Sequence, residues 1–253
     1  MGEIRPHLVR YRLPSSEKTD CPETFAEKMN EICTIYHEAE AVREKGGHTI
    51  SVDEMTGIRA LEHKYPDKPV MPGKTARMEF EYIRHGTISL IGFFDIATGR
   101  MEMPYLNPTR TEDDFVKAIR ALVETDPAAS WTFVCDGLNT HKSESLVRFV
   151  AEQCGFSGDL GCKGKFGILK NQESRAKFLH QEGHRIRIVY TPKHCSWVNQ
   201  IEIWFGIISR RLLKRKSYQS IDELKASILR FIEQYNIMAK PFKWTYKGVP
   251  LTA

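Results

Sequence analysis

The sequence predicts an α/β domain, a mixed sheet of about five strands flanked by helices. Short strand-like apolar runs alternate with longer segments of helical periodicity. One pair of strand-like runs is separated only by a tight turn, so those two strands are antiparallel within the sheet. The chain has 253 residues, which is enough to bury a sizeable core.

The N-terminal part is predicted to contain an arm, a helix and a strand. Residues 1–20 show no periodicity, which indicates an extended arm. A helix is expected over 22–45, with proline in its first turn and the glycines at 46–47 ending it. HTISVDE at 48–54 has strand character, and 55–80 is rich in proline, glycine and charge, which predicts a loop.

A hairpin, a helix and a strand follow in the middle of the chain. Residues 80–106 read as two strands joined by a turn at 97–99. The segment 111–126 has helical periodicity, and Thr111 is its expected N-cap because an acidic residue stands three positions later. WTFVCD at 131–136 is the fourth strand.

The remaining elements are mostly helical. A helix over 143–155 ends at a glycine. The glycine- and lysine-rich stretch 157–175 is predicted to be a flexible loop or insertion, and 185–192 a fifth strand. Apolar residues at helical spacing follow from 199 to 215, and a last helix begins at Ser220, which has a glutamate three positions later.

Bulk properties narrow the class of protein. The net charge of +5 permits nucleic-acid binding without requiring it. No apolar run approaches the roughly 18 residues that would span a bilayer. The six cysteines form no CxxC pair, which argues against a zinc ribbon or a disulfide framework and indicates a cytosolic protein. Five Lys or Arg lie within SRRLLKRKS at 209–217, either as a solvated face or as a contact for phosphates.

Three acidic residues occupy similar positions in the predicted fold. Asp53 ends the first strand, Asp136 ends the fourth, and Glu202 lies in the first turn of the helix after the fifth. Ligands of open α/β sheets gather at the carboxyl ends of strands. Carboxylates clustered there repel one another, and Mg²⁺, which prefers oxygen ligands, relieves that repulsion. Acidic residues at strand ends are also common turn and cap residues, so both interpretations stay open at this point.

The local sequence around these carboxylates resembles that of a known family. VDE at 52–54, CDGLNTHKS at 135–143 and YTPKHCSWVNQIEIWFGIISRR at 190–211 together resemble the insertion sequence 630 family, bacterial DDE transposases of the mariner superfamily. The resemblance extends from about residue 5 to residue 248. The last block is the most specific, because a strand ending in TP followed by HCSWVNQIEIWF is similar to the family's third-carboxylate motif.

The resemblance implies an RNase H-like catalytic core in which Asp53, Asp136 and Glu202 hold two Mg²⁺ or Mn²⁺ ions. It implies metal-dependent strand cleavage at the ends of a mobile element, followed by transfer of the 3′-hydroxyl into target DNA. The implied partners are double-stranded DNA, with a TA target, and a second copy of the chain in a homodimer. The implied location is the bacterial cytoplasm, at the nucleoid.

Further residues are candidates for DNA contact or for support of the site. Four are polar residues near the second and third carboxylates, namely Asn139, His141, His194 and Asn199. For the first two of these, capping of the following helix is an equal alternative. The others are basic, namely Arg210, Arg211, Lys214, Arg215 and Lys216. The aromatic residues of this region, Trp197, Trp204 and Phe205, are predicted to lie in the core.

The sequence departs from the family pattern in two places. The separation before Glu202 is longer than in the family, which places an insertion at about 157–183. The chain opens on what resembles the linker after a DNA-binding region. We therefore expect a linker arm and helix over 1–46, following a missing N-terminal DNA-binding region, and the catalytic domain over 47–253. The alternatives are a truncated, inactive DNA-binding relic or regulator, and an RNase H-like nuclease.

Overall fold

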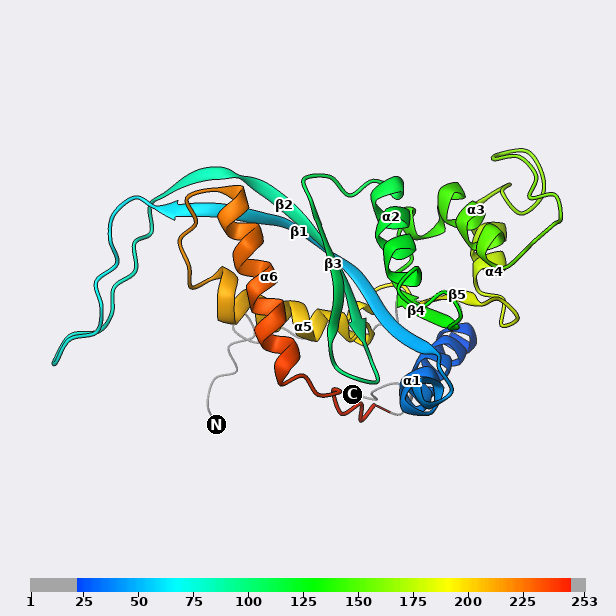
Figure 1. Ribbon diagram of the computed structural model, residues 1–253, viewed down its shortest axis with the longest axis horizontal. Coiled ribbons are helices and arrows are strands. Elements are labelled where there is room, and N and C mark those ends of the chain that lie inside the picture. Colours follow the sequence, from blue (N-terminus) through cyan, green and yellow to red (C-terminus); the bar gives the residue numbers. More distant parts are fainter. Residues whose placement is uncertain (1–21, 247–253) are drawn as a thin grey trace, which may run out of the picture.

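A computed structural model describes residues 22–246, so the arm predicted over 1–20 lies outside the described residues (Figure 1). The centre of the structure is a five-stranded sheet in the order β3-β2-β1-β4-β5. The strands are β1 (His48–His63), β2 (Tyr82–Asp95), β3 (Met101–Asn107), β4 (Trp131–Cys135) and β5 (Ile186–Tyr190). β1, β2 and β3 are antiparallel, whereas β1, β4 and β5 are parallel, which confirms the mixed sheet.

Helices cover both faces of the sheet (Figure 1). One face carries α1 (Pro22–Glu44), α5 (Ile201–Ile208) and α6 (Ile221–Ile237). The other carries α2 (Glu112–Val123), α3 (Glu144–Gln153) and α4 (Gln172–Leu179). Of the helices between residues 22 and 246, none combines the length and apolar character needed to cross a membrane.

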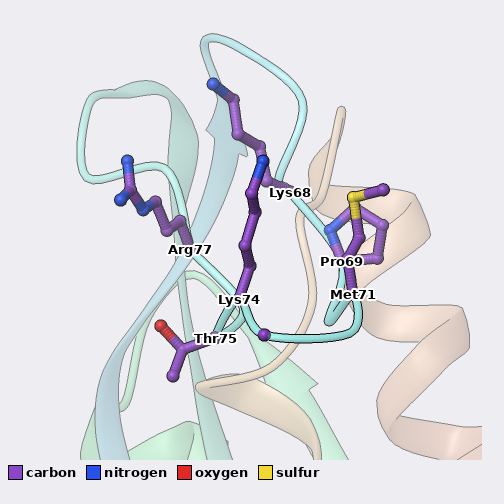
Figure 2. A pocket seen from close by; sticks show the side chains of 7 residues that line it. Lys68, Pro69, Met71, Lys74, Thr75 and Arg77 are labelled. Carbon is purple, nitrogen blue, oxygen red and sulfur yellow. The ribbon is translucent and has the colours of Figure 1, made fainter.

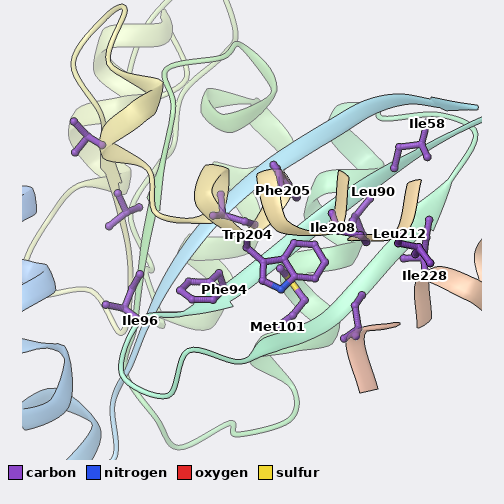
Figure 3. Close-up of a cluster of buried hydrophobic side chains, with 14 of the residues drawn as sticks. Ile58, Leu90, Phe94, Ile96, Met101, Trp204, Phe205, Ile208, Leu212 and Ile228 are labelled. Carbon is purple, nitrogen blue, oxygen red and sulfur yellow. The ribbon is translucent and has the colours of Figure 1, made fainter. Parts of the chain in front are cut away.

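The core on the α5–α6 face is built around Trp204, which is fully buried (Figure 3). It lies near Phe94 of β2 and Met101 of β3, and Phe205 is buried beside it. The prediction that these two α5 aromatic residues lie in the core is therefore confirmed. It is wrong for Trp197, which is 44% exposed because it lies in a short 3₁₀ turn, Ser196–Val198, outside the helix.

The predicted helix caps are confirmed. The Thr111 hydroxyl accepts from the backbone N–H of Asp114, and the Asp114 carboxylate accepts from the backbone of Thr111, which makes a reciprocal capping box. At α6 the hydroxyl of Ser220 accepts from the N–H of Glu223 at 3.1 Å. The Glu223 carboxylate accepts from the N–H of Gln219, one residue before the cap, at 2.8 Å.

The loop predicted over 55–80 is wrong in its first third. β1 continues to His63, where it still pairs with Tyr82 of β2. Beyond the central core, β1 and β2 form a two-stranded ribbon of which only one face is covered. Ile58 and Ala60 are therefore buried, while polar neighbours are exposed. Residues 64–81, here called the β-arm, extend the ribbon away from the body and close through bridges between Lys68 and Arg77 and between Met71 and Lys74.

The stretch predicted as a flexible loop contains regular structure. Asn171 caps α4, which begins at Gln172 inside the insertion. Leu169 is fully buried and joins the core on the α2–α3 face. Gly161, at φ +81°, allows the close approach of the chain, because a Cβ there would lie 2.2 Å from the carbonyl oxygen of Phe166. Gly161 and Gly167 therefore allow tight packing of the backbone, whereas Gly164 faces open space.

Candidate active site

Two of the predicted carboxylates lie at the same edge of the sheet. Asp53 belongs to β1, and Asp136 directly follows β4. These strands are parallel neighbours, and Ser51 pairs with Val134. Asp53 and Asp136 each lie two residues further on, so the same register brings them opposite each other where β4 ends. The prediction that Asp53 ends the first strand is wrong, because β1 continues past it to His63.

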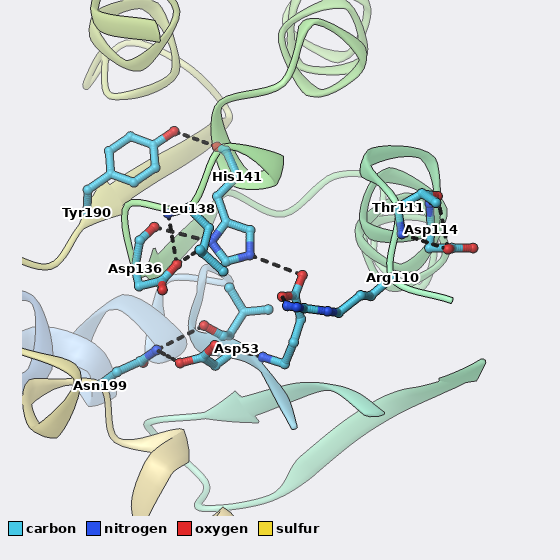
Figure 4. A network of polar contacts seen from close by, with 11 residues as sticks. Asp53, Arg110, Thr111, Asp114, Asp136, Leu138, His141, Tyr190 and Asn199 are labelled. Atoms are coloured by element: carbon cyan, nitrogen blue, oxygen red, sulfur yellow. Dashed lines mark hydrogen bonds and ion pairs between the residues drawn. The ribbon is translucent and has the colours of Figure 1, made fainter. Parts of the chain in front are cut away.

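The third carboxylate is tied to β1 by a buried polar cluster. The Ser51 hydroxyl accepts from the backbone N–H of Ile201 at 2.9 Å and donates to the side-chain oxygen of Asn199. The Asn199 amide donates to the Val52 carbonyl at 3.0 Å and to Oδ2 of Asp53 at 3.2 Å (Figure 4). Because these bonds hold the start of α5 against β1, Glu202, the second residue of α5, lies on the side of Asp53.

The three acids affect one another electrostatically. Asp53 is 8% exposed. Burial raises its pKa, the Glu54 backbone N–H opposes the rise, and the charges of Asp136 and Glu202 add to it, which brings the pKa to about 6. Burial and the charge of Asp136 also raise the pKa of Glu202. Burial is the largest cause of both raised pKa values, and the neighbouring carboxylates add to it.

Asp136 differs because a cation stands beside it. Burial would raise its pKa, but His141, the Leu138 N–H and Lys142 together lower it. Nδ1 of His141 lies 2.8 Å from Oδ1 of Asp136, and Nε2 lies 3.4 Å from Oε1 of Glu54 (Figure 4). Burial would lower the pKa of His141, but its contacts with Cys135, Asp136 and Glu54 raise it well above its usual value.

The residues fit a hard divalent cation by their chemistry. Within residues 22–246, no three His, Cys, Asp or Glu side chains are already arranged as a metal-binding cluster. The donors of Asp53, Asp136 and Glu202 are carboxylate oxygens, the ligands that Mg²⁺ and Mn²⁺ prefer. The raised pKa values of Asp53 and Glu202 show negative charge that such a cation would neutralise.

The predicted DNA contacts divide into buried and exposed residues. His141 and Asn199 are fully buried, so from these positions they support the carboxylates and do not meet DNA. Asn139 and His194 are exposed. Asn139 makes no side-chain cap, and its Oδ1 accepts from Gln172 at 2.7 Å. The predicted basic residues are exposed on a π-helix, Ser209–Leu213, and the turn after it, namely Arg210, Arg211, Lys214, Arg215 and Lys216.

Sequence reasoning missed three supporting residues. Ser51 bonds both Asn199 and the start of α5, and its signal was a small hydroxyl residue inside an otherwise apolar strand. Arg110 lies 3.5 Å from the Glu54 carboxylate, and the Tyr190 hydroxyl donates to the His141 carbonyl at 2.8 Å. Neither of the latter two carries a local signal, because each contact joins residues far apart in the chain.

A mixed sheet of this order, with acids on two neighbouring parallel strands and on a helix packed beside them, defines an RNase H-like domain. The profile of one family, described as DDE superfamily endonuclease, matches residues 48–225. The match covers more than half of the chain, and the chain belongs to this family of endonucleases. The DDE part of the predicted resemblance is thereby confirmed, while the narrower insertion sequence 630 name stays a prediction.

Solved structures share the fold. The chain superposes on the "Mos1 Strand Transfer Complex" with a TM-score of 0.53 and 13% identity, covering 92% of this chain and 59% of the other. The "Mos1 mariner paired end complex with Mn" gives a TM-score of 0.50 and 14% identity, covering 92% and 60%. The chain thus spans about 60% of the length of these transposase chains. No curated protein matches the sequence significantly.

Proposed function

We propose that this chain is the catalytic part of a DNA transposase that cuts DNA at the ends of a mobile element and joins the freed end to target DNA. The observation that carries the proposal is the geometry that places Asp53 and Asp136 on neighbouring parallel strands, with Glu202 on the helix whose start is bonded to β1. Membership of the DDE endonuclease family supports it.

Asp53, Asp136 and Glu202 would hold Mg²⁺ or Mn²⁺, as two ions, and the fold match described above includes a complex crystallised with Mn. When bound, such ions act as Lewis acids at the phosphate and at the attacking and leaving oxygens. The protein's own part is to hold the carboxylates: the Asn199 amide orients Asp53, and the Leu138 N–H and His141 hold Asp136.

The proposed reaction consists of two phosphoryl transfers. In the first, a water oxygen bonds to phosphorus at the element end, the bond to the 3′-oxygen breaks, and the 3′-hydroxyl takes up a proton. In the second, that hydroxyl attacks a phosphorus of the target, loses its proton, and displaces the target's own 3′-oxygen. Each step forms one P–O bond and breaks one, so no covalent enzyme intermediate is needed.

Two basic surfaces support binding of double-stranded DNA, comprising element ends and a TA target. One is the exposed basic run at 210–216. The other is the β-arm, on which Lys68, Lys74 and Arg77 project from the ribbon (Figure 2). Basic side chains on exposed surfaces contact phosphates and position a protein on DNA. Asn139 and His194 are exposed and lie in the chain between Asp136 and Glu202, and we propose them as further DNA contacts.

The β-arm also supports a homodimer in the active complex. Large apolar side chains are exposed on it, with Val70 73% and Phe80 84% exposed. Apolar groups presented together on a projecting element are typical of a protein–protein contact. A second copy of the chain is the partner that we propose for it. Because DNA is the proposed substrate, we propose the bacterial nucleoid as the location of the protein.

The test is nicking of supercoiled DNA with Mg²⁺ or Mn²⁺, followed by a search for strand-transfer products. Asp136→Ala is expected to abolish both, whereas Glu233→Ala, which removes an exposed carboxylate on α6, is expected to leave both intact. Nicking that survives Asp136→Ala would refute the assignment. Nicking without strand transfer would indicate a nuclease of the same fold, and salt-dependent binding without cleavage an inactive DNA-binding protein.

A further inference from the structure

Two charged side chains beside the carboxylate cluster are buried, although the proposed chemistry does not use them. The side chain of Glu54 is 2% exposed, and that of His141 is 0% exposed. Burying a charged group is costly unless it is paired. Their position, one next to Asp53 in the chain and the other in contact with Asp136, raises the question of what they do for the site.

His141 is held between two carboxylates. Its Nδ1 lies 2.8 Å from Oδ1 and 3.2 Å from the carbonyl oxygen of Asp136, and its Nε2 lies 3.4 Å from Oε1 of Glu54. Both ring nitrogens therefore lie near carboxylate oxygens: the Nδ1 contact has hydrogen-bond length, whereas the 3.4 Å Nε2 contact is an ion-pair distance without a hydrogen bond. Glu54 supplies the charge that keeps the ring directed along the line between the two acids.

The ring is fixed by its surroundings as well. The Phe115 ring packs against the imidazole with centroids 4.3 Å apart. The Tyr190 hydroxyl donates to the His141 carbonyl at 2.8 Å, which ties the turn after β4 to β5. On the far side, Arg110 lies 3.5 Å from Oε2 of Glu54. Contacts from α2, β5 and the segment before α2 thus define one orientation of His141.

This arrangement selects one oxygen of Asp136. His141 contacts Oδ1, and the Leu138 backbone N–H donates to the same Oδ1 at 3.0 Å. Both contacts leave the second oxygen, Oδ2, to face a ligand. A carboxylate restrained at one oxygen loses little freedom when a cation binds the other, and groups behind metal ligands are known to orient them in this way.

We propose that His141, anchored by Glu54, is a positioning residue that restrains the Asp136 carboxylate so that it presents a single oxygen to the divalent ion. This inference rests on the proposed function, since it assigns Asp136 as a metal ligand. His141 acts through Asp136 and touches neither DNA nor the reacting phosphate. Groups behind metal ligands typically contribute 10- to 100-fold to metal affinity, which sets the scale of the expected effect.

Two substitutions of His141 separate positioning from a merely structural role. In His141→Asn the amide nitrogen takes the place of Nδ1, so the donor to Asp136 is retained and the reach to Glu54 is lost. In His141→Gln the amide takes the place of Nε2, so the reach to Glu54 is retained and the donor to Asp136 is lost. Both remove the ring from the same buried position, so they share the loss of packing against Phe115.

The experiment measures Mn²⁺ binding by the purified full chain, by the loss of the free Mn²⁺ signal in electron paramagnetic resonance, with circular dichroism to verify folding. His141→Gln is expected to weaken Mn²⁺ binding ten-fold or more, and His141→Asn by less than three-fold. Equal weakening by both folded variants, or none in either, would overturn the proposal.

A further variant keeps the test decisive if His141→Gln does not fold. Glu54→Gln retains the size of the side chain and removes the anchoring charge, and it should weaken Mn²⁺ binding by about two-fold, within the range expected for His141→Asn. Unchanged binding would overturn the proposal. Asp136→Ala distinguishes the two levels of inference. If Asp136→Ala binds Mn²⁺ like the wild type, the proposed metal site itself fails. If it loses Mn²⁺ while His141→Gln does not, only the role of His141 fails.

Discussion

The carboxylate of Asp114 holds the segment that leads into α2 beside the site. It is 6% exposed and is an acceptor for side chains and backbone on both oxygens. The donors are Tyr105 and Asn107 at 3.0 Å, the Thr109 hydroxyl at 2.8 Å, and the N–H and hydroxyl of Thr111 at 2.8 and 2.9 Å. The same segment carries Arg110, the neighbour of Glu54, so the network stabilises one wall of the site.

The structure sets the magnitude of this stabilisation. Burial would raise the pKa of Asp114, but the bonds from Thr111, Thr109 and Tyr105 lower it to about 2 from 3.8. At 1.36 kcal/mol per pKa unit, this difference corresponds to about 2 kcal/mol. Because the folded pKa lies below the unfolded one, the contribution is complete above about pH 4 and is lost as the pH falls toward 2.

Asp114→Asn is therefore expected to lower the free energy of unfolding by about 2 kcal/mol at pH 7 and by roughly half as much at pH 3. Urea denaturation followed by circular dichroism at both pH values measures the difference. The control is Asp113→Asn on the same helical turn, which is exposed and should change stability by less than about 0.5 kcal/mol. A difference between wild type and Asp114→Asn that is the same at both pH values would refute the reasoning.

Gly99→Ala should lower the melting temperature much more than Gly46→Ala, although both glycines have positive φ. The reason is that a Cβ at Gly99 would lie 2.1 Å from a backbone carbonyl oxygen, whereas Gly46 faces open space, so equal shifts measured by calorimetry would contradict the packing. Asn199→Ala removes the 3.2 Å donor to Asp53 and should cost about 1–3 kcal/mol of stability together with metal-dependent nicking, and undiminished nicking would count against its supporting role. Mn²⁺ should raise the melting temperature of the wild type, and a chelator should reverse the rise. In Glu202→Gln most of this Mn²⁺-induced rise should vanish, and a full rise in that variant would exclude Glu202 as a ligand.

Local signals were sufficient for much of the fold. The cap at Thr111, the cap at Ser220 and the turn at 97–99 were all predictable, because each depends on residues within three or four positions of one another. The strand end before Asp136 was predictable for the same reason, since a short apolar run stops at a polar residue, whereas the strand end predicted at Asp53 was wrong because β1 continues to His63. Local chemistry thus located the candidate carboxylates.

Non-local pairing defeated prediction elsewhere. Nothing in the composition of 55–63 indicates a strand, because that segment is held by its partner β2 and covered on one face only. Leu169 was predicted within a flexible loop, yet it is buried against helices from an earlier part of the chain. Trp197 was predicted to be buried for its size, but the 3₁₀ turn that carries it directs it outward.

The sequence by itself identified three candidate acids, near two strands and on one helix, in segments that resemble a family of DNA-cutting enzymes. Only the tertiary structure decided their electrostatic surroundings, including the burial that raises the pKa of Asp53 and the position of His141 between Asp136 and Glu54. The physical reason is that burial and charge are set by neighbours in space, and here those neighbours come from strands and helices that are far apart along the chain.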